Sequence, residues 1–416
     1  MKRIGAFFLG LLLALAGLAC IALGLVGAYG DGERATRFLA GTAAIPFGIM
    51  LLELGLATVW FAGRARHGGV MHPANLPPWW ASALLFAAAV LGGWLALRFE
   101  QWWLFFPLAT VAVFAPIAAT GRLGLPRVGA RPSWARLLVA FGWGALVTPV
   151  LAVTVQMVAL IGAFGAVALG ISASGQRNLQ LLADTWTYRL QGRILNDTQT
   201  AALLQFLLQQ PVVLAVGAAI LVFVGPASEE LGKFGATLFF SRTRRNATGP
   251  IPDPPMAIFL IGLASGLGFA ATENIFYVAQ GQEAGWWQAA LLRAVTPIMH
   301  GTASALFALG WARQFQRPRS WALLWGALGA LGLHGLWNLC AGLAIVGGSF
   351  ASAPGSTMAL GATILIASVG LLGGLLLLSV VILLRQRRVL AREGAELPGL
   401  PPPLPSPPHP ALQVAA

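Results

Sequence analysis

Charge is scarce in this sequence. Only 9% of its 416 residues are Asp, Glu, Lys or Arg, whereas 57% are hydrophobic, and the mean hydropathy is +0.77. A soluble protein of this length needs about a quarter of its residues charged to cover its surface. Apolar runs of about 20 residues recur instead, long enough to cross a bilayer as helices. The alternating pattern of a membrane β-barrel is missing. We therefore predict an all-α fold, a polytopic integral membrane helical bundle.

The apolar runs predict about ten transmembrane helices, at 5–29, 38–62, 80–97, 102–120, 139–164, 211–240, 256–279, 289–311, 321–346 and 358–384. With a cytoplasmic N-terminus, 18 of the 26 basic residues fall on the inner side, seven on the outer side, and Lys233 lies within a span. This bias follows the positive-inside rule, so we expect both termini to be cytoplasmic. The net charge of +13 then reflects topology and anionic headgroups, and we expect no nucleic-acid partner.

Cysteine and aspartate are also scarce, and their positions exclude several chemistries. Cys20 and Cys340 are the only cysteines, and both lie in apolar runs, so neither indicates a disulfide or a thiol site. All four aspartates fall in predicted loops, which excludes an aspartyl dyad within the membrane. No His-Glu-x-x-His occurs, and Ser265 lacks the glycine of a rhomboid-like Gly-x-Ser-Gly turn. Glutamate and histidine are therefore the residues left for a reaction centre within the membrane.

Composition divides the chain into five regions. Residues 1–170 hold five spans with few intramembrane polar groups, chiefly Glu53 and Gln156, and residues 171–210 form a polar outer segment. Most of the intramembrane polar residues fall in 211–346, the final span in 347–384, and a basic and then proline-rich cytoplasmic tail in 385–416.

Four successive predicted helices within 211–346 carry polar residues spaced four apart, which places each pair on one helical face. The pairs are Glu229/Glu230 with Lys233, Glu273 with Tyr277, His300 with Ser304, and His334 with Asn338. A charged group at mid-membrane costs about 2.5–3.5 kcal/mol. We therefore interpret the four helices as converging on one buried reaction centre.

The first of these helices contains Pro226-Ala-Ser-Glu-Glu-Leu-Gly-Lys233. We expect Pro226 to kink or break the helix and Ser228 to cap its continuation. Glu229 and Lys233 can share a proton or a salt bridge, and adjacent glutamates in a low dielectric do not both ionise easily. A structural ion pair beside a spectator glutamate is the alternative.

The second helix allows two interpretations of Glu273, and it also carries a glycine pattern that indicates helix packing. Glu273 is either a reacting group or a carboxylate that Tyr277 or Arg293 merely satisfies. In the same span Gly262 and Gly266 are four residues apart, which predicts a face where another helix packs closely.

Histidine is rare, with five in the chain, yet His300 and His334 lie close to the centres of successive spans. Two histidines at matched depth beside two glutamate-bearing helices indicate a functional site rather than histidines that only fill the helix interface. Asn338, one turn after His334, is placed to orient a carbonyl or to donate to an oxyanion.

At these residues the chain resembles the PrsW family of intramembrane proteases, within a wider superfamily that includes the CAAX-prenyl endopeptidases and bacteriocin-processing (CPBP) proteins. The matching pieces are Glu229-Glu230-x-x-Lys233, Phe269-x-x-x-Glu273-Asn274 with Tyr277, His300 in Met-His-Gly-Thr, and His334-Gly-Leu-Trp-Asn338. They cover roughly 211–346. The CAAX branch has a histidine where this chain has Glu273, which favours the PrsW side.

The resemblance implies an endopeptidase of the bacterial cytoplasmic membrane that hydrolyses a membrane-embedded or membrane-proximal protein, such as the single-span anti-sigma factor cut by the family's namesake. Two mechanisms fit. In one, His300, His334 and Glu273 hold a Zn²⁺ ion and another glutamate is the base. In the other no metal binds; Glu229 and Glu273 activate water while His334 and Asn338 stabilise the oxyanion.

The candidate site therefore has three groups of residues. The catalytic candidates are Glu229, Glu230, Glu273 and Asn338; the metal ligands are His300, His334 and Glu273; the supporting residues are Lys233, Asn274, Tyr277 and Ser304. Two other functions use similar residues: a proton-coupled transporter or channel, and a catalytically silent scaffold of the same fold. A transporter is typically built from internal repeats, and none is evident here. The oligomeric state is not predicted.

Overall fold

Helices build almost all of the structure, a computed structural model that describes residues 2–30, 33–64, 77–125, 132–170, 211–241, 243–246, 249–280, 282–318, 320–351 and 357–395. Within these ranges nine helices are long and apolar enough to span a membrane, and the β structure is one short antiparallel hairpin. The prediction of an all-α polytopic membrane bundle is confirmed. The polar segment 171–210 and the proline-rich end lie outside the described residues.

The leading part of the chain, up to residue 170, contains α1 (Lys2–Tyr29), α2 (Arg34–Leu39), the π-helical turn η1 (Ala40–Ala44), α3 (Ile45–Arg64), α4 (Trp79–Arg98), α5 (Trp102–Gly124), α6 (Trp134–Gly142), the π-helical turn η2 (Trp143–Val147) and α7 (Thr148–Gly170). The rest contains α10 (Pro211–Ala219), the π-helical turn η3 (Ile220–Val224), α11 (Gly225–Phe240), β1 (Thr243–Asn246), β2 (Gly249–Pro252), α12 (Pro255–Gln280), α13 (Gln282–Arg293), α14 (Thr296–Gln316), α15 (Ala322–Ala351) and α16 (Thr357–Ala395).

The expected span 289–311 is the one that differs most from the structure. The chain there is divided into α13 and α14, and α14 is not among the nine helices apolar enough to span a membrane. Fourteen of its 21 residues are buried inside the protein, including His300, Thr302 and Ser304. A helix that other helices enclose can be polar, because its side chains meet protein groups instead of hydrocarbon.

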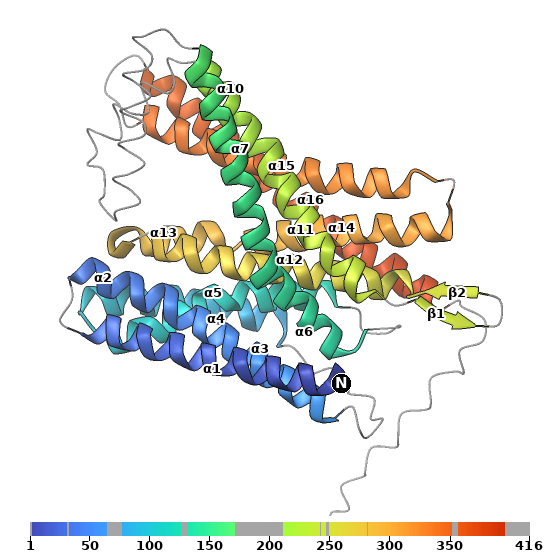
Figure 1. Cartoon of the computed structure of the whole chain (residues 1–416). Helices are drawn as coiled ribbons and strands as arrows, with labels where there is room; N and C mark the ends of the chain where they lie inside the picture. The colour runs from blue at the N-terminus through green and yellow to red at the C-terminus, as the bar shows by residue number, and fades with distance from the viewer. Residues whose placement is uncertain are drawn as a thin grey trace, which may run out of the picture.

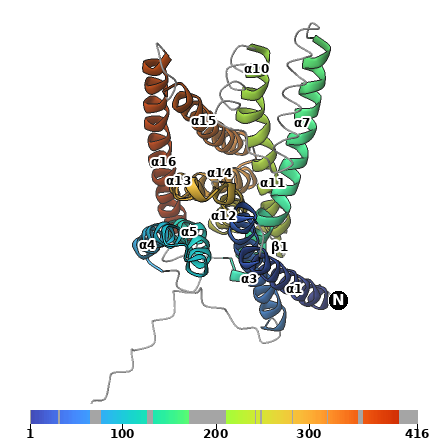
Figure 2. The same cartoon turned by 90° about the vertical axis from the view of Figure 1, so that its left-hand side faces the viewer.

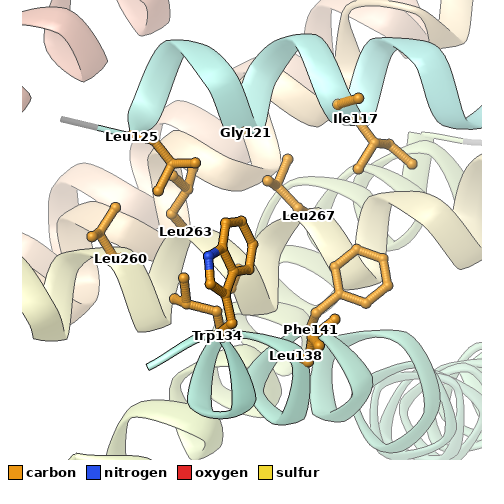
Figure 3. A pocket seen from close by; sticks show the side chains of 12 residues that line it. Ile117, Gly121, Leu125, Trp134, Leu138, Phe141, Leu260, Leu263 and Leu267 are labelled. Atoms are coloured by element: carbon orange, nitrogen blue, oxygen red, sulfur yellow. The ribbon is translucent and has the colours of Figure 1, made fainter. Parts of the chain in front are cut away.

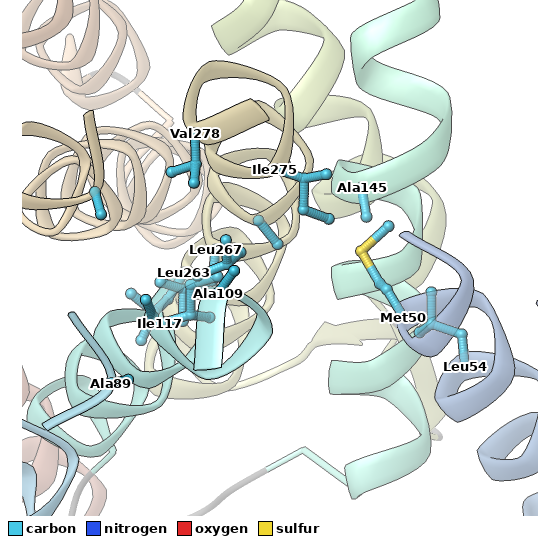
Figure 4. Close-up of a cluster of buried hydrophobic side chains, with 14 of the residues drawn as sticks. Met50, Leu54, Ala89, Ala109, Ile117, Ala145, Leu263, Leu267, Ile275 and Val278 are labelled. Carbon is cyan, nitrogen blue, oxygen red and sulfur yellow. The ribbon is translucent and has the colours of Figure 1, made fainter. Parts of the chain in front are cut away.

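The central helix of the bundle is α12, in which 20 of 26 residues are buried. Its buried side chains join those of α3, α4, α5 and η2 in one hydrophobic core, shown in Figure 4. Leu263 and Leu267 of α12 lie there near Ile117 and Ala109 of α5, whereas Ile275 lies toward Ala145 of η2. The leading helices therefore hold α12 from one side.

On another face, α12 packs directly on the backbone of α14. A Cβ atom at Gly262 would lie 2.6 Å from the Ser304 carbonyl oxygen, and one at Gly266 would lie 2.4 Å from the His300 carbonyl oxygen. Both distances are too short for a side chain, so only glycine permits this approach. The predicted packing face is confirmed, and it places α14 with His300 and Ser304 against α12.

Pro226 is accommodated without breaking the helix. The turn η3 immediately precedes Gly225-Pro226, and α10, η3 and α11 follow one another without interruption. The expectation that Ser228 caps a helix is wrong, because Ser228 lies inside α11 and donates its hydroxyl to the Gly225 carbonyl oxygen at 2.9 Å. The wider π-helical turn absorbs the missing backbone donor of the proline.

The helices form two groups that Figures 1 and 2 distinguish. Helices α1, α3, α4 and α5 lie together below α12, whereas α7, α10, α15 and α16 rise away from that layer at an angle. A cavity of about 160 Å³ lies between α5, α6 and α12, and its lining, seen in Figure 3, consists of side chains such as Ile117, Leu138, Phe141 and Leu267. Because this cavity is apolar and lacks titratable groups, it offers no site for the predicted chemistry.

Candidate active site

Four helices bring the predicted glutamates, lysine and histidines into one buried cluster. Helix α11 supplies Glu229, Glu230 and Lys233, α12 supplies Glu273, α14 supplies His300, and α15 supplies His334. The two imidazole rings lie 4.8 Å apart between centroids and are perpendicular. The structure thus brings together the residues that the spacing pattern placed on four separate helices.

Glu230 lies at the middle of the cluster and is completely buried. Its Oε1 accepts hydrogen bonds from Lys233 Nζ at 2.8 Å and from His334 Nδ1 at 2.9 Å, and its Oε2 accepts one from the Ser304 hydroxyl at 2.9 Å. A buried carboxylate is tolerated when such donors surround it. Since both oxygens are engaged, Glu230 is suited to orienting His334 rather than to receiving a substrate proton.

The hydrogen bonds assign the tautomers of the two histidines. An ammonium group only donates, so His300 Nδ1, 3.0 Å from Lys233 Nζ, is the acceptor, and its Nε2–H donates to Glu273 Oε2 at 2.7 Å. In His334, Nδ1–H donates to Glu230, which leaves Nε2 with a lone pair. Each histidine is thus oriented by one glutamate.

Glu229 differs sharply from its neighbour Glu230. Its Oε1 accepts a hydrogen bond from Gln156 Nε2 at 3.3 Å, but its buried Oε2 has no hydrogen-bond partner. That oxygen lies 3.4 Å from His334 Nε2 and 3.5 Å from Lys233 Nζ. A carboxylate oxygen facing an imidazole lone pair is an arrangement of two acceptors, which a cation or a donated proton between them would satisfy.

The donor set fits a metal ion. One ligand atom from each of Glu229, His300 and His334 can be chosen so that all three lie within 4.8 Å of one another. Two histidines and one carboxylate are a ligand set that Zn²⁺ uses in catalytic sites, and glutamates bonded to the far nitrogens of both histidines are the usual outer partners. Lys233 argues against a bound metal ion, because its ammonium group contacts two of these three side chains, His300 and Glu229.

Glu273, the carboxylate predicted as a metal ligand, lies next to His300 and outside the group formed by Glu229, His300 and His334. Its Oε2 accepts hydrogen bonds from His300 Nε2 and from the Arg293 guanidinium. Its side chain is 21% exposed, and that of Glu229 is 11% exposed, whereas Glu230 and Lys233 are fully buried. Substrate or water approaching the cluster therefore meets Glu273 and Glu229 first.

Asn274 and Tyr277 belong to the surroundings of Arg293. Asn274 Oδ1 accepts hydrogen bonds from Arg293 Nε at 3.0 Å and from the Thr296 hydroxyl at 2.9 Å, across the break between α13 and α14. The ring of Tyr277 lies 4.4 Å from the Arg293 guanidinium, as a cation–π pair. Both residues therefore hold Arg293 beside Glu273.

Asn338 lies on the same helix as His334 but bonds in another direction. Its Nδ2 donates to the Leu221 carbonyl oxygen of η3 at 3.2 Å. One turn earlier, a Cβ atom at Gly335 would lie 2.5 Å from the Val222 carbonyl oxygen. Asn338 and Gly335 thus dock α15 on the π-helical turn, and the structure does not bring the Asn338 amide into the hydrogen bonds of the cluster.

Gln156 is a residue of this site to which the sequence analysis assigned no role. Its amide comes from α7 and donates to Glu229 Oε1 and, at 3.3 Å, to the Ser228 hydroxyl. The signal in the sequence was an amide inside an otherwise apolar span, which is costly unless it has a polar partner. The leading part of the chain therefore contributes to the site.

A buried cluster of glutamates, histidines and a lysine, enclosed by membrane helices and reached past two partly exposed carboxylates, fits the active site of an intramembrane hydrolase. Over residues 132–372 the sequence matches the family described as PrsW family intramembrane metalloprotease, and the chain belongs to that family. It is an integral membrane peptidase. The match begins at α6 and so includes Gln156, beyond the 211–346 expected from the motifs. No curated protein and no solved structure matches the chain.

Proposed function

We propose that this peptidase cleaves a membrane-embedded or membrane-proximal segment of another protein, using water activated at Glu229, His300 and His334. The observation that carries the proposal is the Oε2 of Glu229, which accepts no hydrogen bond and lies 3.4 Å from His334 Nε2 and 3.5 Å from Lys233 Nζ. Buried acceptors left in this way are unfavourable for folding and are kept where they bind something.

The ligand set that the geometry favours is Glu229, His300 and His334, with Glu229 in place of the predicted Glu273. A Zn²⁺ ion held there would polarise the scissile carbonyl and acidify a water molecule. The lone pair of His300 Nδ1 currently accepts from Lys233, so the ammonium has to turn toward Glu230 for this histidine to bind a metal through Nδ1.

The remaining residues act on these three side chains. Glu230 holds the His334 ring through Nδ1, Glu273 holds the His300 ring through Nε2, and Gln156 fixes one oxygen of Glu229. Glu273 is the most exposed carboxylate of the cluster and is our candidate for the general base. In a mechanism without metal, Glu229 takes the role of base and Lys233, 3.5 Å away, stabilises its charge.

The location of the cluster supports the proposed substrate class. The carboxylates are buried among membrane helices, so the scissile bond has to reach them from the bilayer or from its surface. A protein with a single membrane-spanning helix, such as an anti-sigma factor, fits this requirement. We further propose the bacterial cytoplasmic membrane as the location, with both termini on the inner side, on the basis of the arginine distribution.

The test combines metal content with cleavage, using full-length protein purified in detergent. Inductively coupled plasma mass spectrometry should find about one zinc per wild-type chain and almost none in the His300→Ala/His334→Ala variant. Glu53→Gln is the matched control, because Glu53 is an exposed intramembrane glutamate on α3 outside the cluster. Cleavage is read by mass spectrometry on single-span membrane proteins reconstituted with the peptidase in liposomes.

The outcomes separate the alternatives. Zinc in the wild type and in Glu53→Gln, lost together with cleavage in the double histidine variant, supports the metal mechanism. Metal-free protein whose cleavage disappears in Glu229→Gln supports the glutamate mechanism. Cleavage that persists in both the histidine and the Glu229 variants would show that this cluster is not the catalytic centre.

A further inference from the structure

A hollow of about 460 Å³ lies where α4 turns into α5, outside the cluster of glutamates and histidines. Three helical segments, α2, α4 and α13, supply its lining together with the turn that follows α4. The principal lining residues are Arg34, Trp94, Arg98, Glu100, Trp286 and Trp287. Arginines and indoles around one hollow are a combination suited to an anion attached to an apolar body.

The two arginines of the hollow differ in their ion pairing. Arg34 forms an ion pair with Glu100 at 3.4 Å, and both side chains are more than half exposed. Arg98 is also exposed, and its guanidinium has no ion-pair or hydrogen-bond partner among the described residues. Among the lining residues, Arg98 is therefore the guanidinium that is left to bind a ligand.

Trp286 adds a hydrogen-bond donor without an acceptor. The residue is completely buried, its ring lies 5.1 Å from that of Phe105, and its outer edge packs over Gly93 of α4. Its indole N–H is buried and has no partner within the described ranges. A buried donor that lacks an acceptor is unfavourable, and a small turn of this ring, which lines the hollow, would bring the N–H to a ligand oxygen.

The turn beside the hollow contains one residue in a left-handed conformation. Glu100 has a φ of 56°, in the left-handed region that residues with a Cβ atom seldom adopt. Hydrogen bonds hold the turn in this form, among them Gln101 N–H to the Ala96 carbonyl oxygen at 2.7 Å. This is a common way for a helix to end, and it places Arg98, the last residue of α4, at the hollow.

The position of the hollow suggests what fills it. Trp94, Trp102, Trp103 and Trp287 gather at this end of α4, α5 and α13, as in the aromatic belts at membrane–water interfaces. Figure 1 shows α2 and the beginning of α13 at the same end of the molecule, opposite the β1–β2 hairpin. At such an interface the abundant anion with an apolar body is a phospholipid.

We propose that this hollow binds the headgroup phosphate of an anionic phospholipid. Arg98 pairs with the phosphate, and the Trp286 indole N–H donates to an oxygen of the headgroup, while Trp94 and Trp287 contact the glycerol and the first methylenes. The Arg98 guanidinium matches a phosphodiester, and phosphatidylglycerol is preferred over phosphatidylcholine, whose quaternary ammonium would lie beside the arginines.

The site also offers a link to the peptidase, and this step rests on the proposed function. Helix α13 carries Trp286 near its beginning and ends at Arg293, which bonds Glu273. A lipid that fixes α13 would therefore hold Arg293 and Glu273 in place. Lipid binding is measured without any cleavage assay, so the lipid site and the peptidase assignment fail or stand separately.

The experiment is native mass spectrometry of the full-length chain in detergent, titrated with dioleoyl-phosphatidylglycerol and, in parallel, dioleoyl-phosphatidylcholine. We expect one tightly bound phosphatidylglycerol, with affinity about tenfold weaker in Arg98→Gln, because a charged hydrogen bond is lost. Trp286→Phe keeps the ring and removes the N–H, and should weaken binding by about threefold to tenfold. Arg122→Gln, at the far end of α5, is the matched control and should bind as wild type.

Three results would overturn the proposal. The first is equal affinity for the two lipids, or unchanged binding in both Arg98→Gln and Trp286→Phe. The second is equal weakening in Arg122→Gln, which would indicate general attraction to basic residues. The third is displacement of the lipid by an acidic peptide but not by excess glycerol phosphate, which would point to a protein ligand. Thermal unfolding of Trp286→Phe without lipid checks that this core substitution leaves the fold intact.

Discussion

The leading helices α1 to α5 bury mainly apolar side chains, whereas the helices α11 to α15 also bury charged side chains and histidines. Between α1 and α3 the contacts are apolar or between backbones, as where a Cβ atom at Gly17 would lie 2.5 Å from the Leu52 backbone nitrogen. The glutamate within a membrane span of this region, Glu53, is exposed. In the second group the buried residues include Glu230, Lys233 and His300.

The comparison shows what allows charge inside a membrane protein. Helices that face lipid on one side have to stay apolar there, because hydrocarbon offers no hydrogen bonds. Helix α14 is enclosed by α11, α12, α15 and α16, so its histidine and hydroxyl groups meet protein partners instead. The leading helices contribute to the site by packing α12 in place, and the span through α7 contributes Gln156 directly.

The largest expected difference between the two regions is in catalysis. Glu229→Gln should reduce cleavage of single-span substrates by about 10³-fold, since it removes either a ligand or a base, while Glu53→Gln should leave the rate unchanged. Initial rates in proteoliposomes provide the measurement. Equal rates for the two variants would remove the functional distinction between the regions.

The next difference concerns ion pairs. Lys233→Met leaves Glu230 buried without its cation and should lower the free energy of unfolding by about 3–5 kcal/mol. Arg34→Gln breaks the exposed pair with Glu100 in the leading region and should cost about 0–1 kcal/mol. Unfolding in mixed detergent, followed by circular dichroism, compares them. Similar losses would mean that the buried pair is solvated.

Glycine contacts should have similar energies in both regions but different consequences. Gly17→Ala and Gly266→Ala each force a Cβ atom against backbone and should cost about 1–3 kcal/mol. Only Gly266→Ala displaces His300, so only this variant should lose cleavage once stability is accounted for. Gly373→Ala, where a Cβ atom meets nothing within 4 Å, is the neutral control. Loss of cleavage in Gly17→Ala would show that the leading helices act on the site more directly.

The smallest effect should come from Gln156. Gln156→Leu removes the amide that holds Glu229 Oε1 and should weaken zinc binding and cleavage by about tenfold, as for an outer partner of a metal ligand. Thr154→Val on the same helix is the control, because its hydroxyl bonds the Val150 carbonyl oxygen of its own helix. Competition with a zinc-selective dye measures the affinity. Unchanged affinity and rate would confine Gln156 to packing.

The amino-acid sequence by itself determined the class of fold and the identity of most polar residues at the site. Long apolar runs have to be membrane helices, because only internally bonded backbone survives in hydrocarbon. Residues four apart have to share a helical face, so Glu229 with Lys233 and Gly262 with Gly266 were readable as local patterns.

Only the tertiary structure decided how these residues divide their roles. Glu229 and Glu230 are adjacent in sequence, yet Ser304 and His334 satisfy Glu230 while one oxygen of Glu229 accepts no hydrogen bond. Asn338 bonds a carbonyl freed by a π-helical turn, and Gln156 reaches the site from another span. These outcomes depend on which helices pack together, and spacing within one helix holds no information about the orientation of its neighbours.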